Sequence, residues 1–146
     1  MKIQALGFIM VAGLISLSAS ADDLWLTNFE QAKKAATEQK RQILVNFSGS
    51  DWCGWCKKLD SEVFATPEFK EYAKSTLVLF QADFPRNTKQ APEIQKQNEA
   101  LSQTYSVEGF PTVLLLSADG KLLARTGYQR GGGKAYVDHV KKLLKK

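Results

Sequence analysis

Two cysteines three residues apart are the part of this sequence best suited to chemistry. Cys53 and Cys56 lie in the stretch SDWCGWCKKLDSEVF, residues 50–64, and are the only cysteines in the 146-residue chain. A pair at this spacing can form a structural disulfide, bind a metal or act as a redox centre. A disulfide across so small a loop stabilises a fold by roughly 2 kcal/mol, against nearly 5 kcal/mol for a loop of about a hundred residues. A purely structural bridge would therefore be better placed across the fold.

The number of available ligands argues against a zinc site. Structural zinc needs four nitrogen or sulfur ligands, and the chain offers the two cysteines and one histidine, His139, far along the sequence. We therefore predict no metal site. Copper(I) accepts fewer ligands, so a copper(I)-binding carrier remains an alternative, as does a redox-inert binding module. No cofactor is implied.

The position of the pair favours redox chemistry. Cys53 falls where a buried strand is predicted to end and a helix to begin, so unpaired backbone N–H groups and the helix dipole favour its thiolate. We expect the pKa of the Cys53 thiol to fall from about 8.5 toward about 7. Cys56, one helical turn further on, would then attack the mixed disulfide and release the substrate. A small disulfide ring suits this cycle because it is easily opened and closed.

Alternating apolar and amphipathic segments must position these cysteines. The pattern predicts a helix from a cap at Thr27 or Asn28 to about Lys40, a buried strand at 42–47, helices at 54–64 and 67–75, a strand at 76–84 and a helix at about 92–105. The first of these strands leads directly into the cysteine pair, and the helix at 54–64 carries Cys56.

A β-hairpin is predicted near the C-terminal end. Ser-Ala-Asp-Gly separates apolar runs at 112–116 and 121–126, and Gly120 can take a positive φ. Three glycines at 131–133 precede a final amphipathic helix. Strands joined through a helix should run parallel by a right-handed crossover, while the hairpin adds an antiparallel pair. The sequence therefore predicts an α/β fold with a central mixed sheet and helices on both faces.

The first 21 residues have the features of a secretory signal peptide. A short charged start is followed by an apolar run at 3–17 and by Ala19-Ser20-Ala21, which fits a signal-peptidase site. The apolar run is shorter than the roughly 20 residues that a membrane-spanning helix needs. We predict a signal peptide at 1–21 and one domain at 22–146, located in the periplasm or secreted and not membrane-spanning after cleavage.

The charge pattern gives no sign of a nucleic-acid partner. The formal net charge is +5, and removal of Lys2 with the signal peptide lowers it to +4. The lysines are scattered, and the terminal KKLLKK is most simply the solvated side of a helix, without the arginine cluster or interleaved aromatics of a nucleic-acid binder. The 125 residues after the signal peptide suit one core and leave no length for a dimerisation domain, which makes a disulfide isomerase the weaker alternative. We expect a monomer.

The motifs and the predicted order of elements resemble those of the thioredoxin superfamily. The resemblance covers residues 22–146 and rests on WCGWCK after an apolar strand and GFPT before another. The longer stretch FSGSDWCGWCKKLDSEVF, with DFPRN and VEGFPT, is more narrowly similar to secreted bacterial thioredoxin-like proteins. These are related to the periplasmic terminal domain of the membrane thiol:disulfide interchange protein.

The resemblance implies both a fold and an activity. The fold would be a thioredoxin-like three-layer sandwich. The activity would be that of a thiol:disulfide oxidoreductase, most simply a reductase, acting on disulfides of exported proteins. Because soluble reductants are scarce outside the cytoplasm, a membrane-bound thiol donor would supply the electrons.

The resemblance also implies roles for residues outside the cysteine pair. The proline matching Pro111 is cis in the family and packs beside the disulfide, which leaves the backbone around Phe110 free to pair with an extended substrate. Thr112 completes this substrate-binding segment. Trp52 and Trp55 could simply cover the end of the core, but we favour the interpretation that they form an exposed rim that shields the sulfurs and contacts substrate.

Two departures from the ordinary thioredoxin pattern affect the predicted chemistry. Asn46 stands where thioredoxin has a buried aspartate, allowing one inserted residue, and an amide cannot relay a proton. Asp60 lies where the interchange-protein domain has an acidic residue, so Asp60 or Glu62 is the candidate for helping to deprotonate Cys56. Both could equally be surface carboxylates paired with lysines. Between the cysteines, Gly54-Trp55 lacks the histidine of strongly oxidising members, which favours a reductase.

Overall fold

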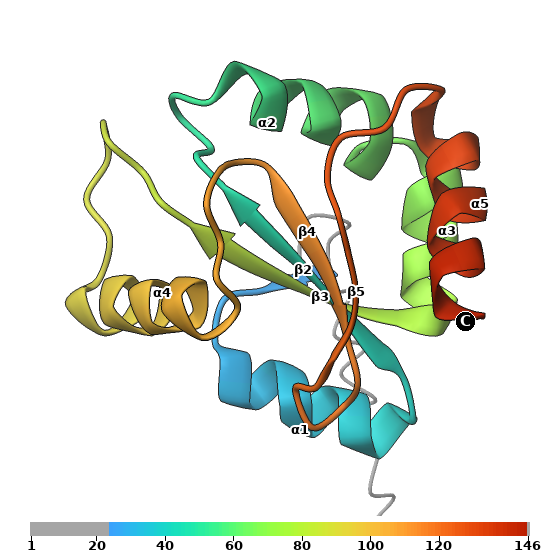
Figure 1. The fold of residues 1–146 in the computed structure, drawn as a ribbon, viewed down its shortest axis with the longest axis horizontal. Coiled ribbons are helices and arrows are strands. Elements are labelled where there is room, and N and C mark those ends of the chain that lie inside the picture. Colours follow the sequence, from blue (N-terminus) through green and yellow to red (C-terminus); the bar gives the residue numbers. More distant parts are fainter. Residues whose placement is uncertain (1–23, 146) are drawn as a thin grey trace, which may run out of the picture.

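A central sheet with helices on both faces forms the molecule (Figure 1). The computed structural model describes residues 24–145, so the predicted signal peptide lies outside the described residues. The elements in chain order are β1 (Trp25–Leu26), α1 (Phe29–Gln39), β2 (Gln42–Ser48), α2 (Gly54–Leu59), the π-helical turn η2 (Asp60–Phe64), α3 (Pro67–Thr76), β3 (Leu77–Asp83), α4 (Pro92–Thr104), β4 (Thr112–Leu116), β5 (Leu122–Thr126) and α5 (Gly132–Leu144).

Five strands form one mixed sheet in the order β1-β3-β2-β4-β5. β3 runs parallel to both β1 and β2, whereas β4 runs antiparallel to β2 and to β5. The predicted parallel crossover and the antiparallel hairpin are both confirmed, and Gly120 in the hairpin has a φ of +92°. The two-residue strand β1 was not predicted, because two residues are too few to show a periodic pattern.

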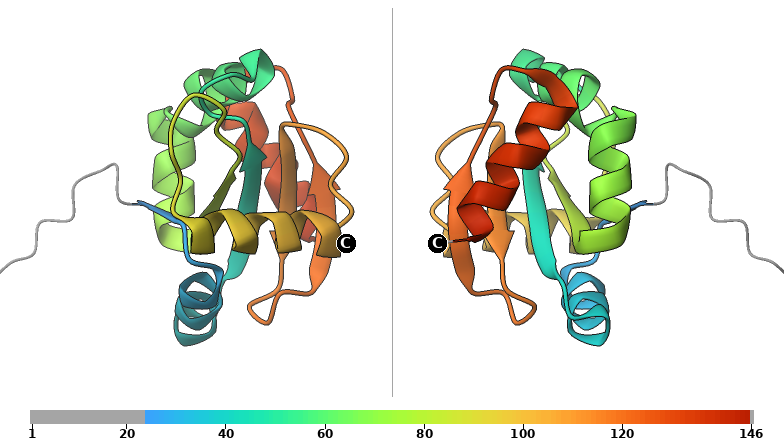
Figure 2. Two further views of the ribbon diagram at one scale, coloured as in Figure 1. Left: turned by 90° about the vertical axis from the view of Figure 1, so that its left-hand side faces the viewer. Right: turned by 90° about the vertical axis from the view of Figure 1, so that its right-hand side faces the viewer.

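Alternate residues of each strand face the two helical layers. On β2, Ile43, Val45 and Phe47 pack against α1 and the end of α4, and Leu44 faces α2, η2, α3 and α5. Figure 2 shows α3 and α5 side by side on one face of the sheet. The predicted three-layer arrangement is thereby confirmed, and it buries β2 at the centre.

The helix after Cys53 changes its hydrogen-bonding pattern half-way along. α2 is α-helical, but in η2 the backbone N–H of Ala65 donates to the carbonyl oxygen of Asp60 over 2.8 Å, five residues back. One residue more than in a regular turn is thus accommodated, and such turns occur often at functional sites. Val63 and Phe64 are consecutive and both buried, so the wider turn directs two neighbouring side chains into the core.

α5 packs very closely on the segment between η2 and α3. A Cβ atom on Gly133 would lie 1.9 Å from Oγ1 of Thr66, which caps α3. The hydroxyl of Tyr136, one turn further along α5, donates to the carbonyl oxygen of Gly127 over 2.9 Å. Burial raises the pKa of the Tyr136 hydroxyl well above its usual range. These contacts fix α5 against the segment that joins η2 to α3 and against the loop after β5.

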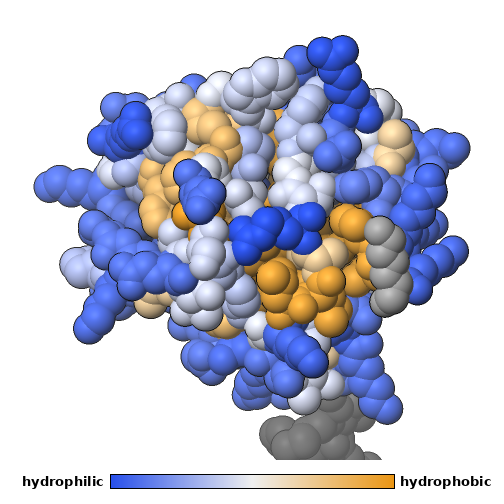
Figure 3. Space-filling model, viewed as in Figure 1, coloured by the Kyte–Doolittle hydropathy of each residue, from blue (hydrophilic) through white to orange (hydrophobic). Residues whose placement is uncertain are grey.

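The outer strand β5 exposes apolar side chains. Leu122 and Leu123 are 41% and 46% exposed, and Figure 3 shows apolar surface on the side of the molecule where β5 lies. Among residues 24–145, no helix combines the length and the apolar character needed to cross a membrane.

Candidate active site

Cys53 and Cys56 form a disulfide at the start of α2. Their Cα atoms are 5.2 Å apart, and Cys53 is the N-cap of the helix. The backbone N–H of Cys56 donates to Sγ of Cys53 over 3.3 Å, so the first turn of the helix directs a donor at this sulfur. Cys53 is 7% exposed and Cys56 3%, which leaves Cys53 the more accessible of the two.

The peptide bond between Phe110 and Pro111 is cis, as the resemblance implied. It brings the backbone before β4 next to the disulfide, with the carbonyl oxygen of Phe110 3.8 Å from Sγ of Cys53. The hydroxyl of Thr112 donates to the carbonyl oxygen of Gly109 over 2.7 Å and closes the same turn. Residues 57 positions apart in the sequence are therefore in contact at the sulfur.

Trp52 is held on three sides. Its indole N–H donates to the carbonyl oxygen of Phe84 over 2.7 Å. The guanidinium of Arg86 lies 3.6 Å from the indole ring centroid, and the Phe110 ring meets the indole edge-on at 5.9 Å between centroids. Gly49 is required beneath the ring, because a Cβ there would lie 2.4 Å from it. Trp52 therefore connects the cysteine turn to the loop after β3 and to the cis-proline turn.

Asp51 orders the loop that carries Arg86. Its carboxylate accepts hydrogen bonds from the backbone N–H of Arg86 at 3.0 Å, the backbone N–H of Asn87 at 2.8 Å and the hydroxyl of Thr88 at 3.4 Å. These bonds, led by the one from Arg86, hold the pKa of the Asp51 carboxyl below its ordinary value. Sequence reasoning did not single out Asp51, Arg86 or Gly49, although the stretches SGSD and DFPRN that contain them were part of the resemblance.

Trp55 stands on the opposite side of the disulfide turn and is 55% exposed. Its ring packs against Tyr128 with 5.2 Å between centroids, and the ammonium of Lys58 lies over both rings. The hydroxyl of Tyr128 donates to the carboxylate of Glu62, a bond that raises the pKa of Tyr128, and Lys58 lies 3.8 Å from the same carboxylate. Glu62 thus supports Trp55 through Tyr128, which sequence reasoning also missed.

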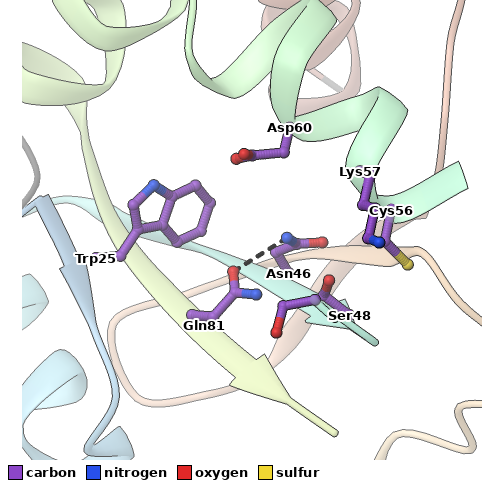
Figure 4. Close-up of a pocket in the computed structure, with 8 residues that line it drawn as sticks. Trp25, Asn46, Ser48, Cys56, Lys57, Asp60 and Gln81 are labelled. Carbon is purple, nitrogen blue, oxygen red and sulfur yellow. Dashed lines mark hydrogen bonds between the residues drawn. The ribbon is translucent and has the colours of Figure 1, made fainter. Parts of the chain in front are cut away.

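A polar pocket of about 340 Å³ lies behind Cys56 (Figure 4). It is lined by side chains from β1, β2, β3, the cysteine turn, α2 and η2, namely Trp25, Asn46, Ser48, Ser50, Cys56, Lys57, Asp60 and Gln81. Asn46 and Gln81 are joined by a hydrogen bond of 3.0 Å between Nδ2 and Oε1. The pocket brings Asp60 to the same space as Cys56, whereas Glu62 is not among its lining residues.

The predicted site residues fall into two groups. One group surrounds the accessible side of the disulfide and comprises Trp52, Trp55, Phe110, Pro111 and Thr112, although the Phe110 ring also packs against the core. The other group lies behind it and contains Cys56 and Asp60. Among the residues that the structure describes, no three His, Cys, Asp or Glu side chains cluster as metal ligands would.

Several known proteins are similar to this chain. A family model described as a thioredoxin-like domain matches residues 29–140. A protein named disulfide bond reductase DsbH, from Chlamydia pneumoniae, is 37% identical over 126 residues, which are 86% of this chain and 76% of that protein. A protein named thiol:disulfide interchange protein DsbD, from Pseudoalteromonas atlantica, is 30% identical over 82% of this chain, but the match spans only 19% of DsbD.

Solved structures confirm the predicted fold. A structure described as DsbH oxidoreductase superposes with a TM-score of 0.79 at 38% identity and covers 83% of each chain. The oxidised C-terminal domain of DsbD from Neisseria meningitidis superposes with a TM-score of 0.55 at 24% identity, over 78% of this chain and 90% of that one, and is a likeness of fold.

Proposed function

Because this chain belongs to the thioredoxin-like domain family, we propose that it is a thiol:disulfide oxidoreductase that reduces disulfides of exported proteins. The observation that carries this proposal is the Cys53–Cys56 disulfide, capped into α2 and in contact with the turn at cis-Pro111. In its reduced, dithiol form the pair holds the two electrons that the reaction transfers, so the chemistry needs no cofactor.

The reaction proceeds in two exchange steps. In the reduced protein the thiolate of Cys53 attacks one sulfur of a substrate disulfide, so that a mixed disulfide forms and the other substrate sulfur leaves as a thiolate. Cys56 then loses its proton and attacks Sγ of Cys53, which closes the ring and releases the second substrate sulfur. The substrate gains two electrons, and two cysteines of this chain lose them.

The helix start supports Cys53 as the attacking sulfur. The N–H of Cys56 already points at this atom in the disulfide form, and the same donor can stabilise a negative charge there after reduction. Cys56 is more deeply buried and lies at the polar pocket, so it suits the resolving step.

Asp60 is our candidate for accepting the proton of Cys56. Both residues line the pocket of about 340 Å³, which is large enough for water to join a carboxylate to the sulfur. Glu62, the other candidate from the sequence, accepts from Tyr128 and lies near Lys58. Its contacts support a structural role at the rim.

We assign substrate contact to the accessible side of the disulfide. An extended substrate segment would lie along the backbone at Phe110, Pro111 and Thr112, with its disulfide over Cys53. The indole of Trp55, 55% exposed, would flank this segment on one side, and Trp52 with Arg86 would flank it on the other. Such a contact uses backbone and aromatic surface, which suits substrates of varied sequence.

The partners and the location belong to the same proposal. The predicted signal peptide at 1–21 favours the periplasm or secretion, where the substrates are disulfide-containing exported proteins. A membrane-bound dithiol donor would regenerate the reduced form, becoming a disulfide itself, and we expect the chain to act as a monomer.

An insulin-reduction assay with dithiothreitol as the donor tests the activity. We expect wild-type protein to accelerate the precipitation of insulin chains and Cys53→Ser to return the rate to the uncatalysed one. Equal rates for wild type and Cys53→Ser would end the proposal. A tight anaerobic copper(I) complex lost in Cys56→Ser, together with equal rates, would favour the copper carrier.

A further inference from the structure

One buried polar atom near the disulfide has no partner among the described residues. Asn46 is 5% exposed and its Nδ2 donates to Gln81, but its Oδ1 is buried and accepts no hydrogen bond. Buried acceptors are almost always satisfied, because an unpaired one keeps the full cost of leaving water. The donor to Oδ1 therefore comes either from water in the pocket that Asn46 lines or from another state of the protein.

The orientation of the amide indicates where that donor comes from. Asn46 and Cys56 line the same pocket, and Gln81 fixes the amide by holding its nitrogen on the β3 side. Figure 4 shows the Asn46 oxygen turned away from Gln81, toward the side of the pocket where Cys56 and Lys57 lie. The Oδ1 acceptor of Asn46 thus faces the side of the pocket where Cys56 lies.

The redox reaction itself creates a donor at this place. In the disulfide form, Sγ of Cys56 carries no hydrogen. Reduction by a dithiol donor adds two electrons and two protons, the donor becomes a disulfide, and Cys56 becomes a thiol whose S–H can donate. Oδ1 has no donor among the described residues in the oxidised form and would have the Cys56 thiol as its donor in the reduced form.

We propose that Asn46 is a positioning residue that accepts a hydrogen bond from the Cys56 thiol and shifts the redox equilibrium toward the dithiol. The proposal rests on the proposed function and adds a residue that sets the redox equilibrium of the Cys53–Cys56 pair. An uncharged amide accepts the hydrogen bond without removing the proton. Proton removal is left to Asp60, at the same pocket.

The equilibrium with glutathione measures this effect. Asn46→Leu keeps a side chain of similar size and removes the acceptor. It also removes the donor to Gln81, but that loss is the same in both redox states and cancels. We expect the equilibrium constant to move about tenfold toward the disulfide, which corresponds to a potential about 30 mV more negative. Ser48→Ala changes another wall of the pocket and is expected to leave the constant unchanged.

Two results would overturn the proposal. An unchanged constant in Asn46→Leu would mean that Oδ1 is equally satisfied in both states. A shift toward the dithiol would mean that the amide opposes reduction.

A second measurement keeps the native Asn46. In Cys53→Ser, the single remaining thiol is Cys56, and its S–H stretching band in the infrared should lie at lower frequency than that of an unbonded thiol. A band at the unbonded frequency would contradict the proposal even if Asn46→Leu did not fold. The glutathione titration contains no insulin, so an inactive wild type would refute the proposed function, and an unshifted constant in an active protein would refute only this inference.

Discussion

The backbone N–H of Cys56 points at Sγ of Cys53, with 3.3 Å between nitrogen and sulfur. The hydrogen bond joins the two ends of the same four-residue ring, and its donor belongs to the first turn of α2. In the reduced protein this donor favours the thiolate of Cys53 over its thiol, because only the thiolate is a strong acceptor.

The first prediction concerns the acidity of Cys53. We expect the pKa of this thiol to lie below that of free cysteine, so that alkylation by iodoacetamide stays fast as the pH falls below neutrality. The rate against pH should be measured in reduced Cys56→Ser, where Cys53 is the single thiol. Cys53→Ser serves as the matched control and should react more slowly, since the remaining Cys56 thiol is the less accessible of the two and lacks the N–H donor that Cys53 has. A Cys53 that titrates like free cysteine would remove the basis of the mechanism.

The second prediction separates the two candidate proton acceptors, Asp60 and Glu62. Asp60→Asn should slow the resolving step by at least about 100-fold, because it removes the proposed proton acceptor. The measurement loads Cys53 with thionitrobenzoate and follows the release of the coloured thiolate as Cys56 attacks. Glu62→Gln is the control and should leave the release rate near that of wild type. If Glu62→Gln slows release and Asp60→Asn does not, the assignment is reversed.

The third prediction concerns the loop around Arg86 and its response to acid. The pKa of Asp51 is lower in the folded protein than its ordinary value of 3.8, because backbone N–H groups of the loop bind the carboxylate. The stabilisation is therefore complete above the ordinary pKa and is lost as the pH falls through the lower folded value. The protection of the Arg86 and Asn87 amides against exchange, taken relative to an unfolded chain at the same pH, should fall in that acidic range. In Asp51→Asn the exchange should be faster already at neutral pH, and unchanged exchange would show that other contacts hold the loop.

The fourth prediction tests the close packing of α5. Gly133→Ala should lower the free energy of unfolding by about 1–3 kcal/mol, because the new Cβ would lie 1.9 Å from Thr66. This expected fall is the net change: the clash with Thr66 costs more than the roughly 1 kcal/mol that alanine gains over glycine in a helix. Gly54→Ala is the matched control, since nothing lies within 4 Å of its Cβ position. Urea unfolding of the disulfide form measures both, and equal midpoints would contradict the packing argument.

Local pattern was sufficient to predict most of the fold. The strands β2, β3 and β4 are nearly continuous apolar runs, and the glycines at 120 and 131 mark turns that need a positive φ. The order of the strands in the sheet was not predicted, because it depends on which faces pack together. The π-helical turn was also missed, since its residues are spaced as in an ordinary amphipathic helix.

The site residues that belong to short sequence motifs were predicted, and those that depend on contacts between distant segments were missed. Cys53, Cys56 and Pro111 stand in recognisable motifs. The positions of Arg86 over Trp52 and of Tyr128 beside Trp55 arise from loops distant in the sequence, and no pattern marks them. The unpaired oxygen of Asn46 required the structure, because its neighbour Gln81 is 35 residues away.

The wide turn η2 also sets the phase between the two halves of its helix. Each residue of an α-helix advances the side-chain direction by about 100°, so a regular α-helical turn that kept all five residues of η2 would rotate one half of the helix by that angle relative to the other. Either the cysteine side chains or the Phe64 ring would then face away from their present contacts. Removal of one residue from η2 would instead allow a regular helix in which both halves keep their present directions.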